Sequence, residues 1–91
     1  MPSPIVSLNR AVAVAMSRGP KAALELIDEL SVAGELEEYH LLHAARADML
    51  RRLGENDAAA KSYQTALELV TNDSERRFLE RRLREVRSLP Q

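Results

Sequence analysis

The segment from Tyr39 to Val70 constrains the fold most strongly, because its apolar residues recur at three- and four-residue steps on both sides of one glycine. The pattern predicts a helix from about Glu37 or Glu38 to Gly54 and a second helix capped by Asn56 or Asp57. The two apolar faces are predicted to be Leu42, Ala45, Met49, Leu50 and Leu53, and then Ala59, Tyr63, Ala66, Leu67 and Val70. Because glycine readily adopts the conformation that ends a helix, we expect an antiparallel hairpin.

The chain before this hairpin has the same organisation. Ser3 followed by Pro4 is typical of an N-cap and a first helical residue, and Gly19 followed by Pro20 predicts the end of one helix and the start of the next. The apolar stripes of these two helices are Ile5, Leu8, Val12, Ala15 and Met16, and then Ala23, Leu24, Leu26, Ile27 and Leu30. A flexible connection is expected around Gly34.

A fifth helix follows the central hairpin. Asn72 and Glu75 have the spacing of a capping box, which predicts a helix from about Asp73 to Ser88. Its apolar seam is predicted to be Phe78, Leu79, Leu83 and Val86. The other face carries arginines interleaved with acidic residues, so we expect it to be solvated and internally paired. The sequence therefore predicts one all-α domain, residues 1–91, of about five antiparallel helices.

Composition excludes several classes of function. The chain contains no cysteine, which removes disulfides, thiolate metal sites and a cysteine nucleophile, and which suits a reducing cytoplasm. A net charge of −1 supplies no broad basic surface for nucleic acid. The longest apolar run, from Ala11 to Met16, is far shorter than the roughly 20 residues of a membrane-spanning helix. We therefore expect a soluble, cytoplasmic protein without a membrane partner.

The two glycine turns mark an internal repeat. Gly19 and Gly54 are 35 residues apart, which is close to the period of about 34 residues in tetratricopeptide arrays. The second copy resembles that family at four positions, which are Ala47, Ala59, Tyr63 and Ala66. The first copy is more degenerate, and its second helix matches only after a one-residue shift. The resemblance implies two tetratricopeptide-like hairpins followed by a C-terminal capping helix.

The sequence contains no strong pattern for catalysis or for a cofactor. No glycine-rich phosphate loop or nucleophile elbow is present, so we expect no enzyme activity. His40 and His43 have a spacing that could present two imidazoles to a metal ion, but a zinc site needs three or four ligands. We therefore predict that they pack and form hydrogen bonds near the start of the third helix, with no metal and no cofactor.

A candidate partner surface follows from the repeat. In a shallow superhelix the inner surface is built from first-helix positions, which here are Asn9, Ala13, Met16, Ala44, Asp48, Arg51 and Arg52. Tetratricopeptide domains that clamp the C-terminal carboxylate of chaperone peptides carry Lys and Asn at such positions, and only Asn9 fits that pattern. We predict that Asn9, Asp48, Arg51 and Arg52 contact a protein partner.

A more specific resemblance comes from three strings, SLNRAVAVA, YHLLHAARADMLRRLG and SYQTALELVTNDSERRFLERRL. Together they resemble the C-terminal tetratricopeptide-like extension of bacterial extracytoplasmic-function RNA polymerase sigma factors, over roughly Ser3 to Leu83. The residues that carry this resemblance are Tyr39, His40, Ala44, Arg46, Ala47, Arg52, Leu53 and Gly54, with Asn72, Glu75, Arg76, Phe78, Leu79 and Arg82.

This resemblance implies a C-terminal fragment of a longer sigma factor, acting as a non-catalytic, regulatory protein-interaction domain. The implied partners are the N-terminal sigma domains or the RNA polymerase core, without direct contact to nucleic acid. A preceding helix or a second copy of the chain could cover the exposed end of the repeat. Two alternatives stay open, a free-standing tetratricopeptide-like scaffold unrelated to transcription and a helix bundle that binds nucleic acid.

Overall fold

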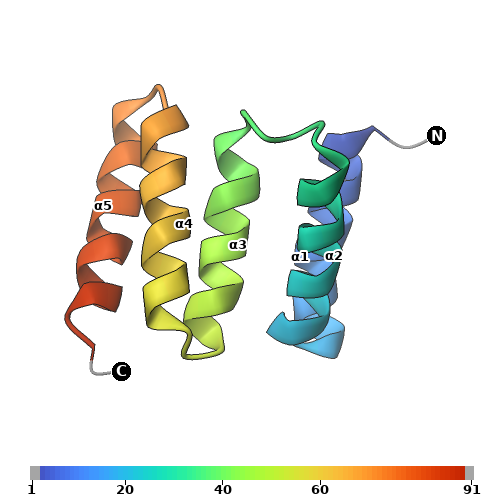
Figure 1. Ribbon diagram of the computed structural model, residues 1–91, viewed down its shortest axis with the longest axis horizontal. Helices are drawn as coiled ribbons and strands as arrows, with labels where there is room; N and C mark the ends of the chain where they lie inside the picture. Colours follow the sequence, from blue (N-terminus) through green and yellow to red (C-terminus); the bar gives the residue numbers. More distant parts are fainter. Residues whose placement is uncertain (1–2, 90–91) are drawn as a thin grey trace.

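The computed structural model describes residues 3–89 and contains five helices in that range (Figure 1). Their bounds are α1 Pro4–Arg18, α2 Pro20–Ala33, α3 His40–Arg52, α4 Asn56–Leu69 and α5 Asp73–Arg87. The described residues form no strand, so the predicted all-α fold with five helices is confirmed. Residues 1–2 and 90–91 of the predicted domain lie outside the described range. None of the five helices has the length and apolarity needed to cross a membrane.

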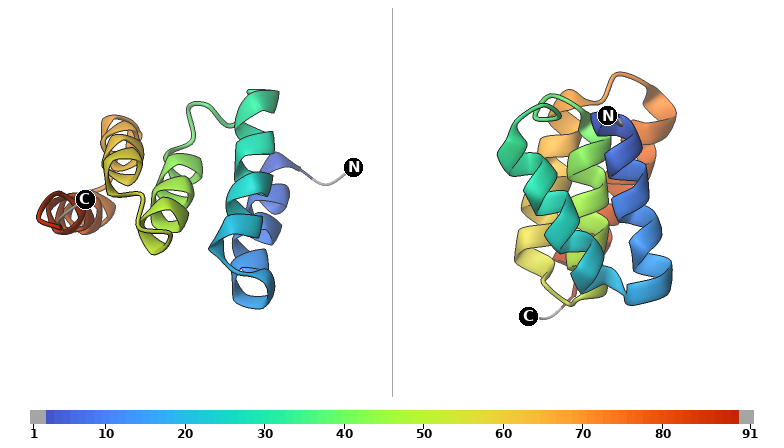
Figure 2. Two further views of the ribbon diagram at one scale, coloured as in Figure 1. Left: turned by 60° about the horizontal axis from the view of Figure 1, so that its bottom comes forward. Right: turned by 90° about the vertical axis from the view of Figure 1, so that its right-hand side faces the viewer.

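Each helix packs mainly on its neighbours in the sequence. The α1/α2 hairpin lies beside α3, and α3 and α4 form the second hairpin, against which α5 packs through α4. The molecule measures 40 × 29 × 20 Å along its principal axes. Seen from the side, α1 and α5 lie along one side and α2 and α4 along the other, with α3 between them (Figure 2). This layering leaves α1, α3 and α5 along a common surface.

The helix ends follow the predicted signals in most places. The Ser3 hydroxyl accepts a hydrogen bond from the Val6 backbone N–H at 3.2 Å. Asn72 accepts one from the Glu75 N–H at 2.8 Å and donates to the Glu75 carboxylate at 2.9 Å, so the predicted cap of α5 is confirmed. Gly54 has φ +79°, a conformation that a side chain would strain, as the turn requires.

Two predicted helix starts are wrong. α3 begins at His40 rather than at Glu37 or Glu38, because those two residues belong to the turn over residues 35–38 and Tyr39 is the N-cap. The N-cap of α4 is Glu55, without a side-chain cap, and the expected cap residue Asn56 is the first helical residue and is buried. In both cases the residue whose side chain is better suited to a helix start lies within one turn of the actual start. Tertiary packing, rather than that local preference, decides which residue begins the helix.

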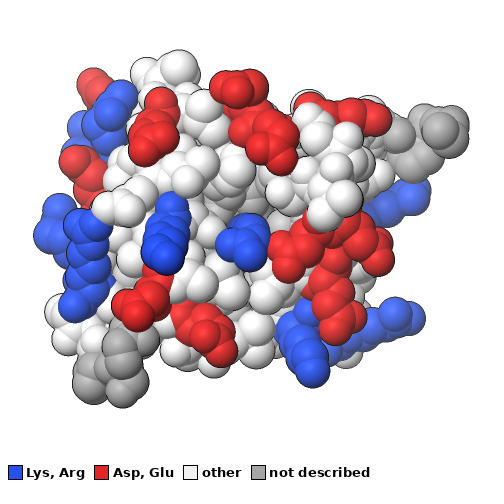
Figure 3. Space-filling view, in the orientation of Figure 1, with Lys and Arg blue, Asp and Glu red and all other residues white. Residues whose placement is uncertain are grey.

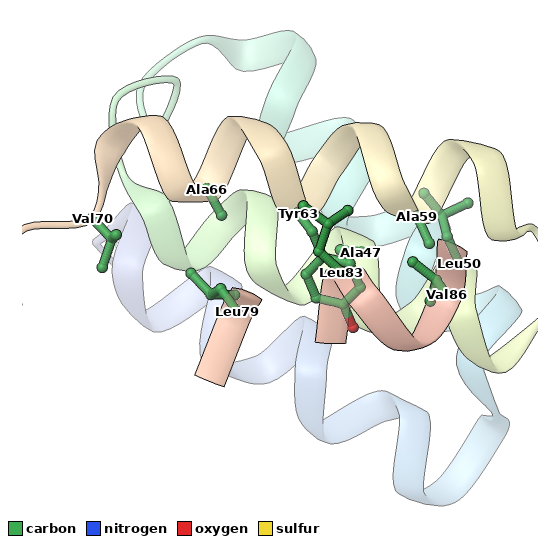
Figure 4. Packing of buried hydrophobic residues seen from close by; sticks show 9 residues of the cluster. All are labelled: Ala47, Leu50, Ala59, Tyr63, Ala66, Val70, Leu79, Leu83 and Val86. Atoms are coloured by element: carbon green, nitrogen blue, oxygen red, sulfur yellow. The ribbon is translucent and has the colours of Figure 1, made fainter. Parts of the chain in front are cut away.

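The first of two core clusters surrounds Tyr63, whose ring extends from α4 among the labelled side chains of Figure 4. Alanines of its own helix and of α3 belong to the same cluster, and Ala59 and Ala66 on α4 and Ala47 on α3 have no exposed surface. The cluster comprises Ala47, Leu50, Ala59, Tyr63, Ala66, Val70, Leu79, Leu83 and Val86. Small side chains let α3, α4 and α5 approach closely enough to enclose one large aromatic ring.

The second cluster joins the two hairpins. It comprises Leu8, Ala11, Ala23, Ile27, Leu36, Leu42 and Met49. Leu36 lies in the α2–α3 connection, which was expected to be flexible, and it is buried as a member of this cluster. The connection is therefore held to the core by an apolar anchor.

Several predicted core residues are exposed instead. Met16 is 92% exposed, and Ile5, Val12, Leu53 and Phe78 are between 38% and 47% exposed. The end position of α1 explains the first three, because α1 packs on α2 and only weakly on α3. Leu53 follows the last helical residue of α3, and Phe78 faces a groove described below.

Replacing Leu42 by Ala should therefore lower the free energy of unfolding by about 2–5 kcal/mol, because Leu42 is fully buried between the hairpins. The matched control is Leu41→Ala, the same change one residue earlier in α3, where the side chain is 40% exposed and a loss within about 1 kcal/mol is expected. Urea unfolding followed by circular dichroism measures both. Equal losses in the two variants would contradict the described orientation of α3.

Candidate functional site

One groove collects all four predicted partner-binding residues. It lies between α1, α3 and α5, has a volume of about 420 Å³, and is lined by Asn9 from α1 and by Asp48, Arg51 and Arg52 from α3. The structure therefore places these residues on a common surface. Ala44 also lines the groove, whereas Ala13 and Met16, which were expected on the same inner surface, do not.

The α3 wall of the groove carries an ordered charge cluster. Asp48 lies three and four residues before Arg51 and Arg52, so all three side chains share one helix face. Its Oδ1 accepts from Arg51 Nη2 at 2.5 Å, and its Oδ2 accepts from Arg52 Nη2 at 3.0 Å. The hydrogen bond to Asp48 raises the pKa of Arg51. One carboxylate thus orients two guanidinium groups toward the groove.

Tyr63 from α4 connects this wall to the core. Its ring is only 1% exposed, yet the residue also lines the groove, so its hydroxyl end lies at the groove floor. Burial raises the pKa of the Tyr63 phenol, and a hydrogen bond from Arg51 and the positive charge of Arg82 partly oppose that shift. Both arginines therefore line the same groove as this tyrosine.

The α5 wall was missed by the sequence analysis, which assigned Phe78 to the core and Arg82 to a solvated face. Both residues line the groove, with the Arg82 guanidinium 5.3 Å from the centroid of the Phe78 ring. Arg82 Nη1 also donates to Glu85 Oε2 at 3.0 Å. The four-residue spacing from Phe78 to Arg82 contained the signal, because it places an aromatic ring and a cation on one helix face.

The two histidines have structural contacts. His40 Nε2 lies 2.6 Å from Glu75 Oε2, which connects the start of α3 to the start of α5. His43 Nε2 donates to the Glu37 carbonyl oxygen at 2.9 Å, which holds the α2–α3 connection to α3. Within residues 3–89, no three side chains of His, Cys, Asp or Glu converge in a way that could hold a metal ion.

A second hollow lies between α2, α3 and α4, and its arginine is already paired. Arg46 Nε donates to Asp28 Oδ1 at 2.8 Å, and its Nη1 donates to the Ser62 hydroxyl at 3.0 Å. This arginine therefore joins three helices. Around it the surface is acidic over α2, where Glu25, Asp28 and Glu29 lie, whereas arginine side chains interspersed with acidic ones lie along the α5 edge (Figure 3). The groove between α1, α3 and α5 is the better candidate site.

Comparison with known proteins gives one relative of similar sequence. An uncharacterized protein of Rhizobium meliloti (strain 1021), R00370, is 39% identical over 90 residues, which cover 98% of this chain and 21% of that protein. This chain therefore spans about a fifth of the length of the relative it matches. No family model matches the chain, and no solved structure matches it.

The raised pKa of Tyr63 predicts a specific pH dependence of stability. The folded-state pKa lies above the ordinary value near 10, so the neutral buried phenol contributes stability that is fully present below about pH 10. That contribution is lost as the pH rises through the folded-state pKa, at up to about 1.4 kcal/mol per pH unit. Tyr63→Phe removes the titrating phenol, so the variant should not show this part of the fall in the free energy of unfolding at high pH.

Urea unfolding of wild type and Tyr63→Phe between about pH 8 and about pH 11 measures the difference. The wild type should lose stability relative to the variant only in the upper part of that range. Parallel curves for the two proteins at all pH values would show that the phenol is not shielded from water.

Proposed function

We propose that this chain is a non-catalytic, regulatory protein-interaction domain of an extracytoplasmic-function sigma factor, whose parent protein takes part in transcription initiation in the cytoplasm. The observation that carries the interaction role is the groove, which gathers Asn9, Asp48, Arg51 and Arg52 from two helices beside half-exposed apolar side chains. Interfaces of this kind use arginine and aromatic side chains as anchors. The proposed partners are the N-terminal sigma domains or the RNA polymerase core.

The residues that carry the sigma-factor resemblance support the proposal through their positions at helix joints. Arg46 connects α2, α3 and α4 through Asp28 and Ser62. His40 and Glu75 connect α3 to α5. A pattern that specifies contacts between helices is more informative about kinship than a generic apolar repeat, because apolar periodicity alone is shared by unrelated helical proteins.

The length of the relative also supports a role as one domain of a longer protein. The match to R00370 covers nearly all of this chain but only 21% of that protein, so a similar segment occurs beside other sequence there. In a longer protein, neighbouring domains would be close to the groove at high effective concentration, which favours regulation by modest affinities. This arrangement suits a regulatory extension.

Binding to RNA polymerase core and to isolated N-terminal sigma domains tests the proposal. We expect one of them to bind the immobilised chain, and Arg52→Glu to weaken that binding by about tenfold or more, because Arg52 lies in the groove and is half exposed. The matched control is Arg87→Glu on α5, an exposed arginine outside the groove, which should change binding by less than about twofold.

Failure of both proteins to bind, under conditions where the chain is folded, would contradict the sigma-factor assignment. The free-standing scaffold predicts that outcome together with a groove-dependent partner from outside the transcription machinery. Equal effects of the Arg52 and Arg87 variants would place the contact elsewhere on the surface.

A further inference from the structure

The groove contains two guanidinium groups whose hydrogen-bonding capacity is only partly used. Arg51 on α3 donates through Nη2 to Asp48, and Arg82 on α5 donates through Nη1 to Glu85. The Nε atoms of both arginines are buried from water and have no hydrogen-bond partner. A buried donor without an acceptor is costly, so an acceptor brought by a ligand would relieve both.

The two groups line one groove from different helices. Arg51 on α3 and Arg82 on α5 both belong to its lining, together with Tyr63 from α4. A guanidinium group carries Nε–H and a terminal N–H side by side, which is the geometry for bidentate pairing with a carboxylate. Their side chains are 25% and 32% exposed, so part of each is open to solvent.

Apolar side chains accompany these cations. Val12 from α1, Leu41 from α3 and Phe78 from α5 all line the groove and are 38%, 40% and 44% exposed. A ligand that covered them would remove their apolar surface from water. The site therefore suits a ligand that carries both carboxylates and apolar groups.

Resting on the proposed function, we propose that the groove binds an acidic segment of a protein partner in which carboxylate side chains alternate with apolar side chains. Arg51 and Arg82 pair with the carboxylates, while Val12, Leu41 and Phe78 receive the apolar groups. Charge complementarity supports this occupant, because the lining contains three arginines and a single carboxylate, that of Asp48. Nucleic acid fits less well, since half-exposed apolar side chains line the groove beside the cations and the whole chain has a net charge of −1.

Fluorescence polarisation with a labelled peptide that alternates Glu and Leu tests the inference. Replacing every Glu of the probe by Gln should weaken binding by about tenfold or more, and so should the double variant Arg51→Gln with Arg82→Gln. The matched control, Arg77→Gln with Arg87→Gln on the exposed part of α5, should change affinity by less than about twofold. Thermal unfolding of each variant checks that it is folded. The comparison of the Glu and Gln probes uses only the wild-type chain, so it does not depend on the folding of any variant.

Equal binding of the Glu and Gln probes, or an unaffected double variant, would overturn the inference. Loss of binding when the C-terminus of the probe is amidated would overturn it too. The groove would then bind the C-terminal carboxylate of the probe rather than its side-chain carboxylates. A single-stranded oligonucleotide that bound more tightly than the Glu probe, and that also required Arg51 and Arg82, would overturn the inference and identify nucleic acid as the ligand.

The test separates this inference from the proposed function. Binding to polymerase core or sigma domains that is insensitive to the Arg51 and Arg82 double variant would leave the function standing and remove the acidic-segment mechanism. If the chain bound the probe but neither polymerase core nor sigma domains, the acidic-segment mechanism would stand and the proposed function would be contradicted.

Discussion

The burial of one tyrosine among alanines determines most of this structure. Tyr63 is the largest of the fully buried side chains, and Ala47, Ala59 and Ala66 make the room for its ring. If these alanines were larger, α3, α4 and α5 would have to separate, and overpacked cores lose stability. The close approach of the three helices in turn brings the walls of the groove together. Packing and site are therefore consequences of the same small set of residues.

The tyrosine also explains why the groove is polar at its floor. An aromatic ring can be buried completely, but its hydroxyl needs a hydrogen-bonding environment. Here Tyr63 lines a groove together with Arg51 and Arg82 from different helices, of which Arg51 is oriented by Asp48 and Arg82 by Glu85. Positive charge is thereby positioned beside apolar side chains from α1, α3 and α5, as in the anchoring part of a protein interface.

Much of this could be predicted from the sequence because it depends on local pattern. The three- and four-residue steps found Leu42, Ala59, Tyr63 and Ala66, and capping chemistry found Ser3 and Asn72. The same periodicity was wrong for Met16, because α1 is the end of the stack and only part of its apolar stripe meets another helix.

The residues of the candidate site on α1 and α3 were predicted from the sequence, but those on α5 were not. Repeat geometry places first-helix positions on the inner surface, which correctly brought Asn9, Asp48 and Arg51 together. Phe78 and Arg82 were missed because the rotation of α5 about its own axis is set by packing against α4, which no local pattern specifies. Local spacing identifies which residues share a helix face, but only tertiary packing decides where that face points.

The most direct test of the account is to observe the two arginine Nε–H groups themselves. Nuclear magnetic resonance of the ¹⁵N-labelled chain can follow the side-chain Nε–H signals of Arg51 and Arg82 while an acidic, apolar-containing peptide is added. We expect these two signals to shift together, in proportion to binding, while those of Arg77 and Arg87 remain unchanged. Binding that leaves the Arg51 and Arg82 signals unchanged would contradict the claim that the groove between α1, α3 and α5 is the interaction site.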